Sequence, residues 1–246
     1  METIWSKVSH RPWPLPKGPW VMEQQWHDLL FAHWRVDEGL LRQHVPGGLE
    51  IDRYQGNAWL GVVPFRTEGV RLRYAPAIPG NSRFPELNVR TYVKHGEKAG
   101  VWFFSLDAAS RLAVAVAKRW FHLPYFFARM RCVERDGWIE YASDRKEGEG
   151  MAAVLRGNYR GEGEKFYAAR GTLEHFLTER YCLYSADAEG NLKRGEIHHA
   201  PWNLQIAKAE ISENSMTKGL GLALGVPELL HFSRRQDVVV WPLQHV

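Results

Sequence analysis

The amino-acid sequence predicts a mostly β fold of the α+β class, an antiparallel β-barrel or cone with one main helix packed on it. Strand-like segments outnumber helical ones, and they follow one another in hairpin order rather than in strict βαβ alternation. The 246 residues contain no internal repeat and no linker-like tract. Because all-β domains of this length often stay single, residues 1–246 are predicted to form a single domain.

The N-terminal segment, residues 1–20, is predicted to be an extended arm. Residues 10–20 contain four prolines, which forbid a helix and favour extended backbone. We expect Trp13 and Trp20 to pin this arm to the body of the protein. The same tryptophan-rich arm also suggests self-association, so a homo-oligomer held together by the arm is a further hypothesis.

The first strand is predicted over residues 21–36, where aromatic and aliphatic residues are frequent. Asp37 follows as the N-cap of a short helix that ends before Pro46. Residues 59–65 form a nearly continuous apolar run. Such a run is typical of a strand that is covered on both faces.

The strand predicted over residues 86–93 carries polar side chains at alternate positions. Glu86, Asn88 and Arg90 fall on one face, whereas the opposite face is mostly aliphatic. One interpretation is a polar patch inside the barrel, where Asn88 and Arg90 bind an anionic or carbonyl ligand. Glu86 would then orient Arg90 or act as a general acid or base. The alternative is a solvated outer face that carries a modest ion pair.

The main helix is predicted over residues 108–120, with Asp107 as its N-cap. A further strand is expected over residues 124–133. Tyr125 and Arg129 lie four residues apart, hence on one face of that strand. We expect Tyr125 either to hydrogen-bond a ligand oxygen or to fill the barrel interior, and Arg129 to bind the ligand.

The composition argues against several classes of partner. The net charge of +4 comes from 32 basic and 28 acidic residues, which are scattered, so no nucleic acid is expected. No apolar stretch is long enough to span a membrane, so no membrane is expected either. Cys132 and Cys182 fit buried free thiols in a reducing compartment, which predicts a cytoplasmic protein. Adjacent His198 and His199 point in opposite directions on a strand, and no spacing resembles a zinc site, so neither metal nor cofactor is expected.

Several pieces of the sequence, in unbroken order, resemble a known family. Residues 16–20, 37–52 and 108–129 look like the corresponding parts of acetoacetate decarboxylase-like proteins. Nearly the whole chain also resembles the uncharacterised YqjF-like branch of that superfamily, which implies a barrel or cone of acetoacetate decarboxylase-like type. The pieces that carry this second resemblance are Trp26–Phe31, Ala58–Phe65, Pro85–Val93, Phe103–Ala108 and Ile197–Trp202.

The resemblance also implies which mechanism is missing. Decarboxylases of the superfamily carry a Pro-Lys-Lys after the helix, and one of these lysines forms an imine with a β-keto acid. The equivalent piece here reads Pro124-Tyr125-Phe126. Tyr125 therefore occupies the position of the reactive lysine, and no Schiff base can form there. The arginine expected after Pro-Lys-Gly-Pro in that superfamily is also absent.

Three functional hypotheses remain open at this point. The first is a cytoplasmic protein with a small-molecule pocket inside the barrel. It would act on a keto acid or another carbonyl compound without an imine, with Glu86 and Tyr125 as candidate catalytic residues. The second is a non-catalytic small-molecule binding protein, a sensor or a carrier. The third is a self-associating scaffold.

Overall fold

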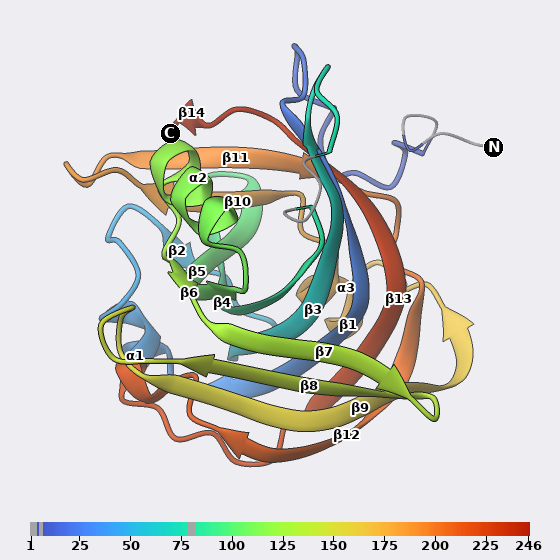
Figure 1. Cartoon of the computed structure of the whole chain (residues 1–246). Helices are drawn as coiled ribbons and strands as arrows, with labels where there is room; N and C mark the ends of the chain where they lie inside the picture. Colours follow the sequence, from blue (N-terminus) through green and yellow to red (C-terminus); the bar gives the residue numbers. More distant parts are fainter. Residues whose placement is uncertain (1–3, 5–6, 78–81) are drawn as a thin grey trace.

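The computed structural model describes residues 4, 7–77 and 82–246, and within them the chain is mostly β (Figure 1). None of the helices in this described part is long and apolar enough to cross a membrane. The helices are α1 (Glu38–Arg42), α2 (Arg111–Phe121) and α3 (Leu173–Thr178), with a short 3₁₀ helix η2 (Lys218–Leu220). The strands are β1 (Met22–Val36), β2 (Glu50–Ile51), β3 (Ala58–Leu72), β4 (Phe84–His95), β5 (Lys98–Ala108), β6 (Tyr125–Phe127), β7 (Arg129–Arg135), β8 (Trp138–Arg145), β9 (Ala153–Phe166), β10 (Cys182–Ala186), β11 (Leu192–His198), β12 (Leu204–Asn214), β13 (Leu229–Val240) and β14 (Gln244–His245).

Seven of these strands form a closed path of hydrogen-bonded neighbours. The order is β13–β1–β3–β4–β5–β10–β11, and it closes because Ile197 and His198 of β11 pair with Val240 and Val239 of β13. Most pairings are antiparallel, as predicted. Within the described residues, however, β5 pairs in parallel with both β6 and β10, which departs from the antiparallel prediction. Helix α2 connects β5 to β6. A helical crossover of this kind lets β6 run in the same direction as β5.

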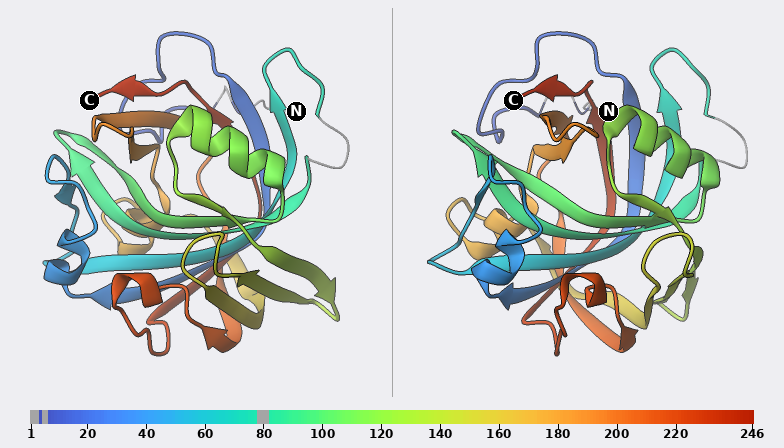
Figure 2. Two further views of the ribbon diagram at one scale, coloured as in Figure 1. Left: turned by 60° about the vertical axis from the view of Figure 1, so that its left-hand side comes forward. Right: turned by 90° about the vertical axis from the view of Figure 1, so that its left-hand side faces the viewer.

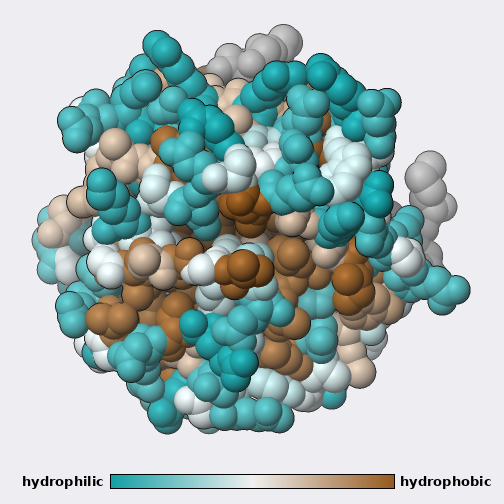
Figure 3. Space-filling view, turned by 90° about the horizontal axis from the view of Figure 1, so that it is seen from below, coloured by the Kyte–Doolittle hydropathy of each residue, from teal (hydrophilic) through white to brown (hydrophobic). Residues whose placement is uncertain are grey.

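The strands β12, β9, β8 and β7 continue from β13 as a leaf that lies beneath the closed path (Figure 1). An apolar core fills the space between the two, where Leu30 and Val62 of the closed path belong to one cluster with Ile139 and Leu155 of the leaf. This cover explains why residues 59–65 are buried throughout, so the prediction that both faces of that strand are covered is confirmed. Seen from below, apolar patches lie between hydrophilic side chains (Figure 3).

Helix α2 lies across one end of the closed path (Figure 2). Its N-cap is Ser110, whose hydroxyl accepts a hydrogen bond from the amide of Ala113 at 3.2 Å. The prediction that Asp107 caps this helix is wrong. Asp107 stays in β5, is fully buried, and accepts a hydrogen bond from the Arg145 guanidinium at 2.7 Å. The predicted cap of the first helix, Asp37, is confirmed.

The strand predicted over residues 124–133 is interrupted. β6 ends at Phe127 and β7 begins at Arg129, and the intervening Ala128 donates its amide to the carbonyl of Ala108 at 3.1 Å. β6 pairs with β5 of the closed path, whereas β7 pairs with β8 of the leaf. The chain leaves the closed path at this break, so Tyr125 and Arg129 do not share a strand.

The N-terminal arm is attached to the body by its tryptophans, as predicted. Trp13 donates its indole N–H to the buried carboxylate of Glu196 at 2.8 Å. Trp20 lies beneath the guanidinium groups of Arg71 and Arg73, 5.7 and 5.4 Å from the ring centroid. These contacts use the same tryptophans that suggested an interface, and self-association by the arm stays a prediction.

The buried pair of Asp107 and Arg145 makes a specific prediction for stability. Arg145→Met should lower the free energy of unfolding by about 3–5 kcal/mol at neutral pH, because it leaves a buried carboxylate without its cation. The double variant Asp107→Leu/Arg145→Met should recover most of that loss, since it removes both charges. Urea unfolding of the two variants checks this. A double variant that is no more stable than Arg145→Met would contradict it.

Candidate functional site

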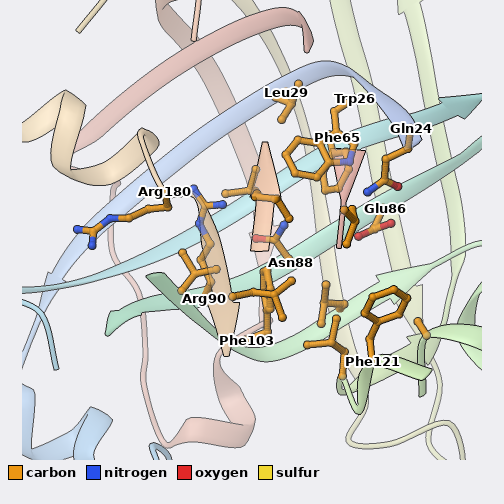
Figure 4. A pocket seen from close by; sticks show the side chains of 18 of the residues that line it. Gln24, Trp26, Leu29, Phe65, Glu86, Asn88, Arg90, Phe103, Phe121 and Arg180 are labelled. Carbon is orange, nitrogen blue, oxygen red and sulfur yellow. The ribbon is translucent and has the colours of Figure 1, made fainter. Parts of the chain in front are cut away.

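A cavity of about 150 Å³ lies inside the closed path, and residues of α2 form part of its wall. Figure 4 shows side chains that line it. A cavity of this size can hold a molecule about as large as benzene. The small side chains Ala113 and Ala117 of α2 contribute to the wall and leave room beneath the helix. Most of the wall is apolar, and its aromatic members include Trp26, Phe31, Phe65, Phe103, Phe121 and Trp202.

The polar row of β4 faces this cavity. Glu86, Asn88 and Arg90 all line it and follow one another along the strand in Figure 4. Glu86 and Asn88 each have only 6% of their surface exposed, so the alternative of a solvated outer face does not hold. Alternate residues of a strand share one face, and here that face is the inner one because all three side chains line the cavity.

Glu86 is a carboxyl group in an apolar wall. It accepts hydrogen bonds from the Tyr125 hydroxyl at 2.8 Å and from the Thr67 hydroxyl at 3.4 Å. Burial raises the pKa of Glu86 from 4.5 to about 7, although both hydrogen bonds lower it. A carboxyl with this pKa can give or take a proton near neutral pH. The prediction that Glu86 orients Arg90 is wrong, because in the described part of the chain the Glu86 carboxyl is hydrogen-bonded to these two hydroxyls instead.

Tyr125 reaches the cavity from β6, the short strand that follows α2. Its hydroxyl lies opposite Glu86 because β5 holds β4 on one side and β6 on the other. Burial, together with the nearby charge of Glu86, raises the pKa of Tyr125 well above its usual value. Tyr125 therefore stays protonated and remains a hydrogen-bond donor.

Asn88 and Arg90 extend the polar row away from Glu86. The Oδ1 atom of Asn88 and the Nε atom of Arg90 are both buried, and neither has a hydrogen-bond partner among the described residues. The Arg90 guanidinium lies near the rings of Phe31 and Tyr92, 5.5 and 5.7 Å from their centroids. The neighbouring Arg180 also lines the cavity, but its guanidinium points away from it in Figure 4.

Arg129 is not brought to this site. It is exposed at the start of β7 and is absent from the cavity wall, so its predicted grouping with Tyr125 is wrong. The cause is the strand break at Ala128, which carries the following residues to the leaf.

Sequence reasoning missed the aromatic part of the wall. Trp26 and Trp202 are stacked with ring centroids 6.0 Å apart, and Phe31 meets Trp202 edge-on at 4.9 Å. A signal existed for Phe31, since it alternates with Leu29 along β1 and both line the cavity. For Trp202 no local signal existed, because it reaches the site from a segment far along the chain.

The wall restricts the chemistry of the site. No lysine is among the residues that line the cavity in the described part of the chain, so none is placed to form an imine with a bound carbonyl. Across the same described residues, no group of three or more histidine, cysteine or acidic side chains is arranged to hold a metal ion. Cys182 and His199 also line the cavity, but Glu86 and Tyr125 are the titratable side chains of the described wall that are hydrogen-bonded to each other.

The architecture is similar to the fold of acetoacetate decarboxylase-like proteins. The enduracididine biosynthesis enzyme MppR in complex with pyruvate superposes with a TM-score of 0.64 at 11% identity, over 93% of this chain and 91% of that one. The acetoacetate decarboxylase of Legionella pneumophila gives a TM-score of 0.64 at 12% identity, over 100% and 96% of the two chains. At such low identity these likenesses concern the fold alone.

The chain belongs to the DUF2071 family, described as an uncharacterized conserved protein, whose pattern matches residues 23–237. It is 47% identical over 231 residues to the uncharacterized protein YqjF of Bacillus subtilis (strain 168), which covers 94% of each chain. The resemblance noted in the sequence is therefore confirmed.

The raised pKa of Glu86 predicts a stability effect with a definite sign. Between pH 4.5 and about 7 the folded state holds the Glu86 proton and the unfolded state does not, so the free energy of unfolding falls as pH rises through this window. Glu86→Gln cannot ionise and should be more stable than the parent at pH 8 by about 1–3 kcal/mol, while the two should be similar at pH 5. Urea unfolding at both pH values measures this. An equal difference at the two pH values would show that Glu86 is not the titrating group.

Proposed function

We propose that the chain binds a small carbonyl compound, such as a keto acid, inside the closed path of strands and moves a proton on it with Glu86. The observation that carries this proposal is a buried carboxyl with a pKa of about 7, hydrogen-bonded by Tyr125 on the wall of a cavity. In this proposal the closed path acts as a barrel that excludes water. The free cysteines Cys132 and Cys182 are consistent with a reducing, cytoplasmic location.

The proton transfer uses both members of the pair. The Glu86 carboxylate removes a proton from the carbon next to the carbonyl group, and the electron pair moves onto the carbonyl oxygen. The Tyr125 hydroxyl turns from Glu86 to this oxygen and stabilises the enolate that forms. Return of the proton from Glu86 to carbon or oxygen completes the reaction. The apolar wall strengthens these interactions because it keeps the local dielectric low.

Two further facts support a small keto acid without an imine. A structural relative, MppR, is described in complex with pyruvate, which is itself a small keto acid. In this chain a tyrosine stands where the sequence resemblance places the reactive lysine, and the cavity wall contains no lysine in the described residues. The reaction therefore proceeds on the free carbonyl compound.

A non-catalytic carrier or sensor is the second candidate. The observation that favours it is the stack of Trp26 on Trp202, which offers apolar contact area but no proton. The two candidates differ in the role of Glu86, which is required for chemistry in the first and only shapes the pocket in the second.

The first functional prediction concerns deuterium exchange next to the carbonyl group of pyruvate and levulinate, followed by NMR. The protein should accelerate this exchange, and Glu86→Gln should lower the rate by about 10²–10⁴-fold. The rate should rise with pH through about 7, where Glu86 loses its proton. Tyr125→Phe should move this midpoint to higher pH, because it removes a hydrogen bond that stabilises the Glu86 carboxylate in the parent protein. Arg131→Gln replaces an exposed residue of β7 and is the control, so its exchange rate should equal that of the parent protein.

Equal exchange by the parent and Glu86→Gln would remove the catalytic role and leave the carrier or sensor.

The second functional prediction concerns the absence of an imine. Borohydride treatment in the presence of pyruvate should leave the mass of the parent protein unchanged. Tyr125→Lys is the matched positive control, since it places an amine in the same buried position beside Glu86, and a trapped adduct is expected on that lysine. A covalent adduct on any lysine of the parent protein would overturn the imine-free proposal.

A further inference from the structure

The end of the cavity beyond Glu86 has polar atoms that the protein leaves without partners. Asn88 is almost fully buried, and its Oδ1 atom accepts no hydrogen bond in the described part of the chain. The buried Nε atom of Arg90 likewise donates no hydrogen bond to any described residue. Other buried polar atoms of the chain also lack a partner, among them Nε1 of Trp59 and Oγ of Ser233. Asn88 and Arg90 differ because they share one face of β4 and line the cavity, where a ligand can pair with them.

Arg90 forms no ion pair with any residue that the structure describes. Its one hydrogen bond there is a long contact of 3.4 Å from Nη2 to the carbonyl of Leu177. Arg180, on the same wall, forms an ion pair with Asp52 at 2.6 Å and also donates to the carbonyl of Phe176. Burial of the Nε atom of Arg90 without a partner is costly. Among the described residues of the wall, Arg90 is therefore the cation left to neutralise a ligand.

The groups around Arg90 cannot supply that partner. The hydroxyl of Tyr92 donates to the carbonyl of Leu177 at 2.9 Å and lies 2.6 Å from the ring nitrogen Nε2 of His33. Burial, with Arg90 and His231 nearby, lowers the pKa of His33 well below its usual value, so this histidine is neutral. Neither side chain carries a negative charge, so neither can neutralise Arg90, although Nδ1 of His33 is itself buried without a partner among the described residues.

The chemistry of Asn88 specifies a second feature of the ligand. A carbonyl oxygen can only accept a hydrogen bond, so its partner must be an O–H or an N–H group. Residues two apart on one strand face are separated by about 6.6 Å, which places a group at Asn88 between a carboxylate at Arg90 and a carbonyl at Glu86.

We propose that the ligand is a small organic acid that also carries a hydroxyl or N–H group a few atoms away from its carboxylate. The carboxylate pairs with Arg90, the hydroxyl or N–H donates to Oδ1 of Asn88, and the rest of the molecule extends toward Glu86 and Tyr125. This rests on the proposed ligand cavity and adds the class of molecule that it selects. A cavity of about 150 Å³ restricts the ligand to a small acid.

The test uses matched pairs of acids in isothermal titration calorimetry. N-acetylglycine and levulinate differ in one position, where the first has N–H and the second CH₂. 3-Hydroxybutyrate and butyrate differ by one hydroxyl. At least one donor-bearing acid should bind about tenfold more tightly than its partner, and the pair that shows it identifies N–H or O–H as the donor. Asn88→Leu should abolish that difference, whereas Asn88→Thr, which keeps an acceptor, should retain part of it.

The carboxylate is tested separately. Arg90→Met should weaken binding of the preferred acid by about tenfold to a hundredfold and leave binding of its methyl ester unchanged, and Arg90→Lys should restore part of the loss. Thermal unfolding of each variant shows that it is folded. Equal binding within both pairs, or an Arg90→Met variant that still prefers acid over ester, would overturn the inference while the cavity stands. Failure of every acid and ester to bind the parent protein would overturn the proposed function as well.

Discussion

The pairing of β11 with β13 is the constraint on which the rest of the structure depends. It joins the last strand of the closed path to the first, so the inner faces of seven strands meet one another instead of water. The two strands pair there over two residues, Ile197 with Val240 and His198 with Val239. Polar side chains that point inward lose water, and this burial is why the pKa of Glu86 is raised toward neutral pH.

The partners of the buried carboxylates separate structural roles from functional ones. Asp107 pairs with Arg145, and Asp28 pairs with Arg66 and Arg234, as expected where a charge only has to be stabilised. Glu86 pairs with no cation among the described residues. Its hydrogen bonds come from hydroxyls, which stabilise its charge less than burial destabilises it. Such an arrangement lowers stability at neutral pH and is typical of sites in which the group has to change its protonation state.

Local sequence patterns predict the structure correctly where a strand keeps its alternation of side chains. They fail where contacts with distant segments decide the position of a residue. The alternation along β4 placed Glu86 with Asn88 and Arg90, but the same alternation fits an outer face equally well, and only the closure of the sheet makes it the inner one. The break at Ala128 depends on a hydrogen bond to Ala108 of β5, so spacing alone wrongly joined Tyr125 to Arg129. Asp107 was read as a helix cap for the same reason, since its partner Arg145 lies on β8.

Tyrosine at position 125 decides how Glu86 titrates. A charged lysine in this place would stabilise the carboxylate and hold the pKa of Glu86 low. The neutral hydroxyl of Tyr125 supplies only a hydrogen bond, so burial outweighs it and the pKa of Glu86 is raised to about 7. Near neutral pH the carboxyl group is therefore present both as an acid and as a base, which is what transfer of a proton from carbon and back again requires.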